Sequence, residues 1–141
     1  MVTPVVVDSD TLIDYFGGYS PLADAVERLI ENDRLAVTTV TLFELASGAQ
    51  SEAQRTDVET LTLASRLLPL DLPSAMRGGQ LYRDLRATGN LLETADLLIA
   101  ACCLSRGLPL LTRNRRHFER IADLRLLSTR QGVESRMDDG Q

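Results

Sequence analysis

Four oxygen-bearing side chains occupy positions suited to metal-dependent hydrolysis. Asp8 closes the apolar run PVVVD, Glu44 lies in the helix expected after the second strand, and Asn114 follows the apolar run LPLLT. In an open parallel sheet, ligands bind beyond the carboxyl ends of the strands, so these three side chains belong to one edge. Asp96 lies in the first turn of the most apolar expected helix, where periodicity alone does not place it. Clustered carboxylates repel unless a hard cation joins them, and oxygen ligands suit Mg²⁺ or Mn²⁺.

Each acid also has a purely structural interpretation. Asp8, Asp10 and Asp96 fit the starts of expected helices, where the helix dipole favours an anion. Thr41 and Glu44 have the spacing of a capping box, although the apolar pattern favours an earlier helix start. Taken singly, each acid is better explained by a structural role. Taken together on one edge, the acids indicate a metal site.

A short arginine-rich segment surrounds Asn114. The net charge of −5 argues against binding nucleic acid through overall charge, so an RNA-binding protein of this composition needs a local basic patch. Arg113, Arg115 and Arg116 are the candidates, because a guanidinium matches phosphate oxygens. The alternative is a solvated turn and helix start. All 15 basic residues of the chain are Arg.

Strand and helix patterns alternate along the chain, which predicts an α/β fold with a central parallel sheet of four to five strands flanked by helices. The expected strands are 4–8, 34–38, 67–70, 108–112 and 125–128. The expected helices are 10–16, 22–32, 39–48, 51–65, 73–86, 93–105 and 115–121.

The length of 141 residues fits one domain, expected over 1–134 and followed by a polar tail at 135–141. No apolar stretch is long enough for a membrane span and the N-terminus lacks a signal peptide pattern, so we expect a cytoplasmic protein with no membrane contact. Cys102 and Cys103 are adjacent within an apolar run and are expected to be small core residues.

Three segments together resemble the PIN domains of VapC toxins, which belong to type II toxin-antitoxin systems. They are VVVDSDTLIDYF, TVTLFELASGA and TADLLIAACCLSRGLPLLTRNRRHFERI. The resemblance extends from Val5 to about Leu127, and its last block is the most specific. It implies a three-layer PIN-like fold. His117 matches the position before Phe118 in the family block, so we interpret it as structural and not as a general base.

The resemblance implies that Asp8, Glu44 and Asp96 are metal ligands of an endoribonuclease that hydrolyses phosphodiester bonds in tRNA or ribosomal RNA. Asn114 occupies a fourth catalytic position that is Asp in many members, which leaves the number of metal ions open. Either Glu44 or Asp96 is a candidate to orient the attacking water. The resemblance also implies a VapB-type antitoxin, whose C-terminal segment enters the acidic groove, and a homodimer.

Two outer contacts to this site each have an equal or stronger structural alternative. Asp10 is a candidate for an outer-shell contact to the metal, or for helix capping. Thr112 is a candidate to hold a water, or to bond the backbone as a strand-end hydroxyl.

Two other functions fit part of the pattern. The segment VVVDSDTLID also resembles the first motif of haloacid-dehalogenase-type phosphatases, with Asp8 as the nucleophile. That chemistry needs a cationic residue, usually Lys, and a late pair of acids after a strand. The chain has no Lys, and the segment LLTRN supplies Asn114 where the acidic pair would stand. The second alternative is a PIN-like binding module that has lost cleavage, against which the three carboxylates argue.

Overall fold

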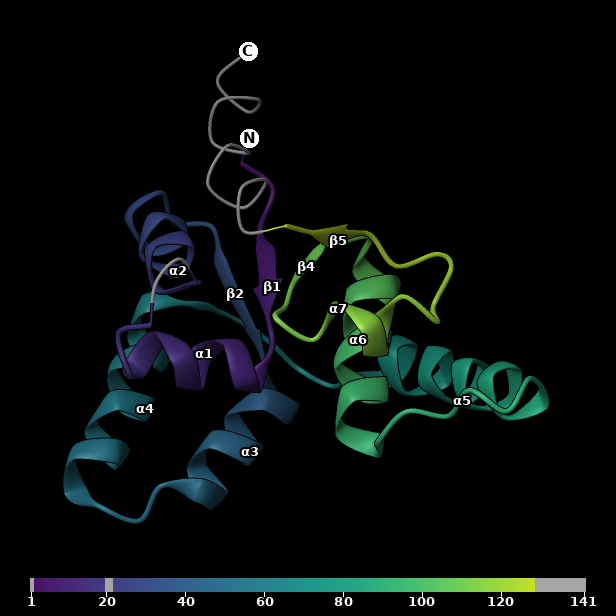
Figure 1. Cartoon of the computed structure of the whole chain (residues 1–141), viewed down its shortest axis with the longest axis horizontal. Coiled ribbons are helices and arrows are strands. Elements are labelled where there is room, and N and C mark those ends of the chain that lie inside the picture. Colours follow the sequence, from purple (N-terminus) through teal and green to yellow (C-terminus); the bar gives the residue numbers. More distant parts are fainter. Residues whose placement is uncertain (1, 20–21, 129–141) are drawn as a thin grey trace.

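The computed structural model describes residues 2–19 and 22–128, so the expected tail at 135–141 lies outside the described residues. Helices and strands alternate as expected (Figure 1). The strands are β1 (Val5–Val7), β2 (Leu35–Thr38), β3 (Arg66–Leu68), β4 (Leu110–Leu111) and β5 (Leu126–Leu127). The helices are α1 (Ser9–Phe16), α2 (Leu22–Glu31), α3 (Thr39–Gly48), α4 (Glu52–Ala64), α5 (Leu72–Ala87), α6 (Thr94–Arg106) and α7 (Arg115–Phe118).

The five strands form one parallel sheet in the order β3-β2-β1-β4-β5. The α/β class and the strand count are therefore confirmed. The order itself was not predicted, and it decides the site, because β1 pairs on one side with β2 and on the other with β4. The carboxyl ends of these three central strands lie next to one another.

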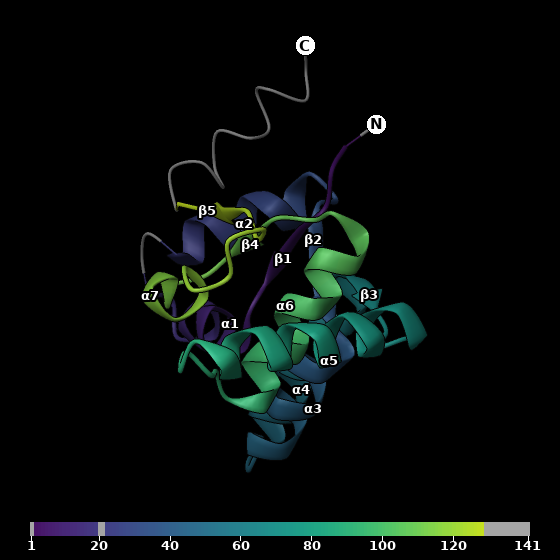
Figure 2. The ribbon, with the colours of Figure 1, turned by 90° about the vertical axis from the view of Figure 1, so that its right-hand side faces the viewer.

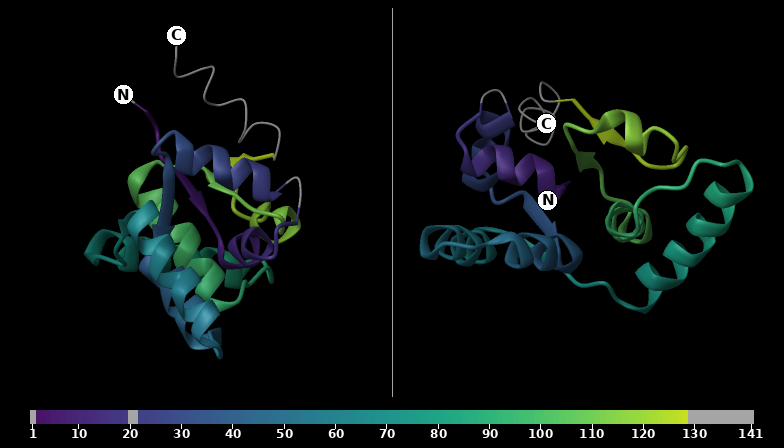
Figure 3. Two further views of the ribbon diagram at one scale, coloured as in Figure 1. Left: turned by 90° about the vertical axis from the view of Figure 1, so that its left-hand side faces the viewer. Right: turned by 60° about the horizontal axis from the view of Figure 1, so that its bottom comes forward.

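Helices cover both faces of the sheet, which gives three layers (Figures 2 and 3). Successive residues of a strand point to opposite faces. Val5 and Val7 therefore pack in the core that contains α1 and α2, whereas Val6 packs in the core that contains α5 and α6. The β-branched run of β1 is buried on both faces, as the sequence predicts for a central parallel strand.

Helix α6 packs closely on α5, and this contact sets the position of its first turn. Gly78 of α5 makes the approach possible, because a Cβ there would lie 3.3 Å from Leu98 and 3.5 Å from the Cβ of Ala101. Helix α6 ends at Gly107, which has the left-handed φ of 65° that the predicted glycine stop requires. Cys102 and Cys103 are free, fully buried core residues, as expected.

Within residues 2–19 and 22–128, no helix has both the length and the hydropathy that crossing a membrane requires.

Candidate active site

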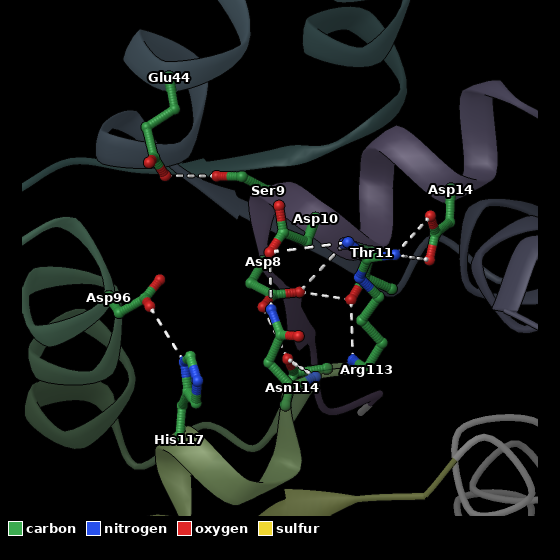
Figure 4. Close-up of polar contacts among 11 residues, drawn as sticks. Asp8, Ser9, Asp10, Thr11, Asp14, Glu44, Asp96, Arg113, Asn114 and His117 are labelled. Atoms are coloured by element: carbon green, nitrogen blue, oxygen red, sulfur yellow. Dashed lines mark hydrogen bonds and ion pairs between the residues drawn. The ribbon is translucent and has the colours of Figure 1, made fainter. Parts of the chain in front are cut away.

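The carboxyl end of β1 places Asp8 at the centre of the candidate site (Figure 4). Asp8 is the N-cap residue of α1, and its side chain accepts a hydrogen bond from the backbone N–H of Thr11. The structural interpretation of Asp8 is therefore correct, although it does not exclude a catalytic one. The side chain is only 2% exposed. Burial raises the pKa of the Asp8 carboxyl, and hydrogen bonds from two threonines offset part of that rise.

Two threonine hydroxyls hold the Asp8 carboxylate, one on each oxygen. Thr11 donates to Oδ1, and Thr112 donates to Oδ2 at 2.6 Å. Each hydroxyl also accepts a backbone N–H from the loop after β4: Arg113 donates to Thr11 at 3.1 Å, and Asn114 donates to Thr112 at 2.9 Å. Because each hydroxyl has a single proton, these amides direct both protons toward Asp8. The carboxylate is thereby fixed in orientation.

Glu44 reaches the site from α3, where its carboxylate accepts a hydrogen bond from the hydroxyl of Ser9. The capping-box alternative for Glu44 is wrong. Thr38 caps α3 by accepting the backbone N–H of Thr41 at 3.1 Å, so the helix begins at Thr39 and Glu44 lies well inside it. No helix-capping role remains to explain this acid.

Asp96 reaches the site from the first turn of α6, and the structure answers the question that periodicity left open. Glu93 occupies the N-cap position without a capping side-chain bond, so Asp96 does not cap its helix. Burial, and next the repulsion of Asp8 and Glu44, raise the pKa of Asp96 to about 6. Asp8 and Glu44 therefore lie close enough to Asp96 to disturb the ionisation of Asp96.

The imidazole of His117 lies beside Asp96, with Nδ1 3.9 Å from the carboxylate. Its side chain is 56% exposed, whereas Phe118 next to it is fully buried. Phe118 is thus the core residue of this pair. The expected structural role of His117 does not extend to packing in the core.

Asn114 lies at the same edge, and its Nδ2 donates to Oδ2 of Asp10 at 2.7 Å. Asp10 therefore contacts Asn114 and caps no helix. Of the three candidate phosphate ligands, Arg113 already forms an intramolecular ion pair, because its guanidinium lies 3.0 Å from the carboxylate of Asp14. Arg116 is exposed and Arg115 half-buried, with its NH1 atom buried and unpartnered among the described residues.

The donor set fits a hard divalent cation. All four candidate ligands present oxygen. The raised pKa of Asp96 reflects burial and, after it, repulsion by other carboxylates, which a cation would relieve. In the described part of the chain, no three acidic, His or Cys side chains form a ready-made ligand shell. Glu44 is bonded to Ser9, so ligation requires that carboxylate to leave the serine hydroxyl.

Sequence reasoning missed Ser9, Thr11 and Asp14, all of which contact site residues. A signal for Thr11 was present, because it lies three residues after an N-cap Asp, where its backbone N–H meets the cap. No local signal indicates that Ser9 contacts Glu44 of another helix.

A cleft of about 400 Å³ opens beside Glu44, between α1, α3 and α4. Its walls are mostly apolar, with Ile13 and Phe16 on one side and Leu45 and Val58 on the other. Asp57 adds a second carboxylate. The cleft therefore suits an apolar segment that carries a positive charge.

The sequence profile of the PIN domain matches residues 5–124. Ribonuclease VapC10 of Mycobacterium tuberculosis is 31% identical over 121 residues, which cover 86% of this chain and 90% of that protein. The tRNA(fMet)-specific endonuclease VapC of Salmonella typhimurium is 32% identical over 101 residues, covering 69% of this chain and 76% of that protein.

Solved structures agree in fold. A chain of the DNA-bound VapBC complex from Salmonella typhimurium superposes with a TM-score of 0.78 at 29% identity, over 92% of this chain and 99% of that chain. VapBC-1 from nontypeable Haemophilus influenzae gives a TM-score of 0.76 at 29% identity, with the same coverage. The chain therefore belongs to the PIN-domain family and, within it, to the VapC ribonucleases.

Proposed function

We propose that this protein is the toxin of a VapBC-type pair and cleaves cellular RNA by hydrolysing phosphodiester bonds where Asp8, Glu44 and Asp96 meet. The observation that carries the assignment is the convergence of three carboxylates from three separate elements. Burial and, after it, the repulsion of Asp8 and Glu44 raise the pKa of Asp96 to about 6. Repulsion between carboxylates lowers the stability of the folded protein. Acids with shifted pKa values are found mainly at functional sites. The PIN-domain match over residues 5–124 gives the cluster its chemical context.

In this proposal Asp8, Glu44 and Asp96 hold a divalent cation, Mg²⁺ or Mn²⁺. When bound, the cation lowers the pKa of a water and stabilises negative charge on the phosphate. Asp8 contributes a carboxylate whose orientation is fixed by Thr11 and Thr112. Glu44 or Asp96 orients the attacking water. Asn114 presents a neutral amide beside Asp10, so the site has less negative charge than one with a fourth acid.

The net charge of −5 repels RNA, so the protein needs local cations to bind the RNA phosphates. Arg115 and Arg116 are the first two residues of α7, three and four residues after Thr112, whose hydroxyl contacts Asp8. Arg116 is exposed and Arg115 half-buried. We assign the phosphate contacts to these two residues. Arg113 is the weaker candidate, because it already pairs with Asp14.

A VapB-type antitoxin is the proposed partner, and the VapBC complexes among the similar structures support it. The cleft beside Glu44 has apolar walls and two carboxylates, which suit a C-terminal antitoxin segment with an Arg. We also propose a homodimer in the cytoplasm. The PIN-domain match over residues 5–124 favours the nuclease over the phosphatase alternative.

The test is cleavage of total cellular RNA by the purified protein, with 5′ ends mapped. We expect cleavage with Mg²⁺ or Mn²⁺, none with EDTA, and none for Asp96→Asn. Glu119→Gln, an exposed acid of matched charge change outside the site, should behave as the wild type. Induction without the antitoxin should arrest growth. Activity that survives both EDTA and Asp96→Asn would refute the metal site, and no cleavage by the wild type would favour the silent binding module.

A further inference from the structure

An ion pair between Arg113 and Asp14 joins the loop after β4 to the second turn of α1. NH1 of Arg113 lies 3.0 Å and 3.2 Å from the two carboxylate oxygens of Asp14. The Asp14 side chain is 13% exposed, so its charge is largely removed from water. A buried carboxylate needs a partner, and breaking such a pair by removing one member is costly. Arg113 is the basic residue that the structure places against it.

The same guanidinium also lies between two acids that repel. Asp10 and Asp14 are four residues apart on α1 and therefore share one face of the helix. NH2 of Arg113 is 4.0 Å from Asp10, while NH1 contacts Asp14. Arg113 thus offsets the repulsion between the two acids and ties both of them to the loop.

This loop supplies the groups that orient the candidate metal ligands (Figure 4). The backbone N–H of Arg113 donates to Thr11, the next N–H donates to Thr112, and both hydroxyls donate to Asp8. The side chain of Asn114 donates to Asp10. A displacement of the loop would therefore disturb both oxygens of Asp8 and the amide beside it at once.

We infer that Arg113 and Asp14 form a positioning pair, which holds the 112–114 loop on α1 so that Asp8 and Asn114 keep the orientation that metal binding needs. Neither residue touches the metal or the RNA in this assignment. The inference rests on the proposed function of the acid cluster. It assigns to Arg113 a role different from that of a phosphate ligand.

The effect of charge and the effect of positioning on metal affinity have opposite signs at Arg113. Removing a cation near a metal site should tighten Mn²⁺ binding if only the electric field matters, and removing an anion should weaken it. Positioning predicts weaker binding in both cases. Loss of groups that orient metal ligands costs about ten- to a hundredfold in affinity.

The experiment measures Mn²⁺ affinity without RNA, by electron paramagnetic resonance of free Mn²⁺, for the wild type, Arg113→Gln, Asp14→Asn and the double variant. We expect Kd to rise about tenfold or more in both single variants, with no further rise in the double variant. Arg28→Gln makes the same charge change at an exposed position of α2, outside the pair, and should not weaken binding. Hydrogen exchange should show faster exchange of the N–H groups of Arg113 and Asn114 in both variants.

Tighter or unchanged Mn²⁺ binding in Arg113→Gln would overturn the inference. So would a higher KM and a smaller salt dependence of RNA binding with unchanged Mn²⁺ affinity, because that result makes Arg113 a phosphate ligand. If Arg113→Gln does not fold, Arg113→Lys and Asp14→Asn carry the same comparison. Failure of the proposed function would give a different result. In that case Asp96→Asn would not reduce the Mn²⁺ binding of the wild type, whatever the Arg113 and Asp14 variants show.

Discussion

Asp8 and Asp96 have the same functional group but different surroundings. Both Asp8 oxygens accept hydroxyl protons, from Thr11 and Thr112. Asp96 has no capping role and faces other carboxylates, with His117 as its neighbour at 3.9 Å. The same substitution should therefore have opposite effects on the stability of the metal-free protein.

We predict that Asp8→Asn and Asp96→Asn both abolish cleavage, because each removes a charged ligand at almost no change in volume. Asp96→Asn should raise the free energy of unfolding of the metal-free protein, because repulsion is lost. Asp8→Asn should lower it by about 1–3 kcal/mol, because the new NH₂ group replaces an oxygen that accepts a threonine hydroxyl proton, so that two donors face each other. Chemical denaturation in EDTA measures both values, and an equal shift for the two variants would contradict this account.

The raised pKa of Asp96 predicts a pH dependence of the metal-free protein. The Asp96 carboxyl has a pKa of about 6 in the fold, against an ordinary value of 3.8. Above about pH 6 the carboxyl is charged in the folded and the unfolded protein, and its charge lowers the free energy of unfolding. This loss of stability becomes smaller as the pH falls from about 6 toward 3.8. The melting temperature in EDTA should be higher at about pH 5.5 than at about pH 7.5. Asp96→Asn should flatten this trend, and a wild type that loses stability over the same fall in pH would refute it.

We predict that Asn114 sets how steeply activity depends on the metal concentration. Its amide donates to Asp10, so Asn114→Asp would place two carboxylates at that contact with no proton between them. We expect Asn114→Asp to destabilise the protein in EDTA and to shift the Mg²⁺ dependence of cleavage to lower concentration, because the added charge attracts a cation. Metal titrations at fixed ionic strength test this. Superimposable curves would show that Asn114 does not influence the metal site.

At the scale of elements, the packing of α5 against α6 positions Asp96. Gly78 lies at the contact, where a Cβ would meet Leu98 at 3.3 Å, two residues after Asp96. Gly79 is its neighbour in the same helix, and a Cβ there would meet nothing within 4 Å. The two adjacent glycines therefore differ in their surroundings, because only Gly78 is packed against α6.

We predict that Gly79→Ala raises the free energy of unfolding by about 0.5–1 kcal/mol, because Ala has the better helix propensity. Gly78→Val should lower it by about 1–3 kcal/mol, because the side chain forces α5 and α6 apart. Cleavage should fall for Gly78→Val only, since α6 carries Asp96. Thermal denaturation and RNA cleavage test both, and full activity of Gly78→Val would show that the site tolerates movement of α6.

At the scale of the whole molecule, the net charge of −5 opposes RNA, so binding depends on a few cations. Replacing both Arg115 and Arg116 by Ala should weaken RNA binding and reduce its salt dependence by about 0.7 unit of slope per lost phosphate contact. The control is Arg28→Ala with Arg83→Ala, an equal charge change at exposed positions of α2 and α5. Equal slopes for the two double variants would assign the effect to net charge alone.

The sequence by itself determined the elements and most of the acid set. Strands and helices follow from hydrophobic periodicity and from glycine stops such as Gly107, which are local signals. The rule that ligands bind beyond the carboxyl ends of parallel strands placed Asp8, Glu44 and Asn114 on one edge. Resemblance to the VapC family added Asp96.

Only the tertiary structure decided which groups surround these acids. The order β3-β2-β1-β4-β5 puts β1 beside β4, and this pairing brings Thr112 to Asp8 across 104 residues of sequence. Arg113 meets Asp14 across 99 residues for the same reason. Periodicity reports the conformation of a short segment, whereas these contacts depend on which strands pair and how closely helices pack. A local pattern therefore contains no information about them.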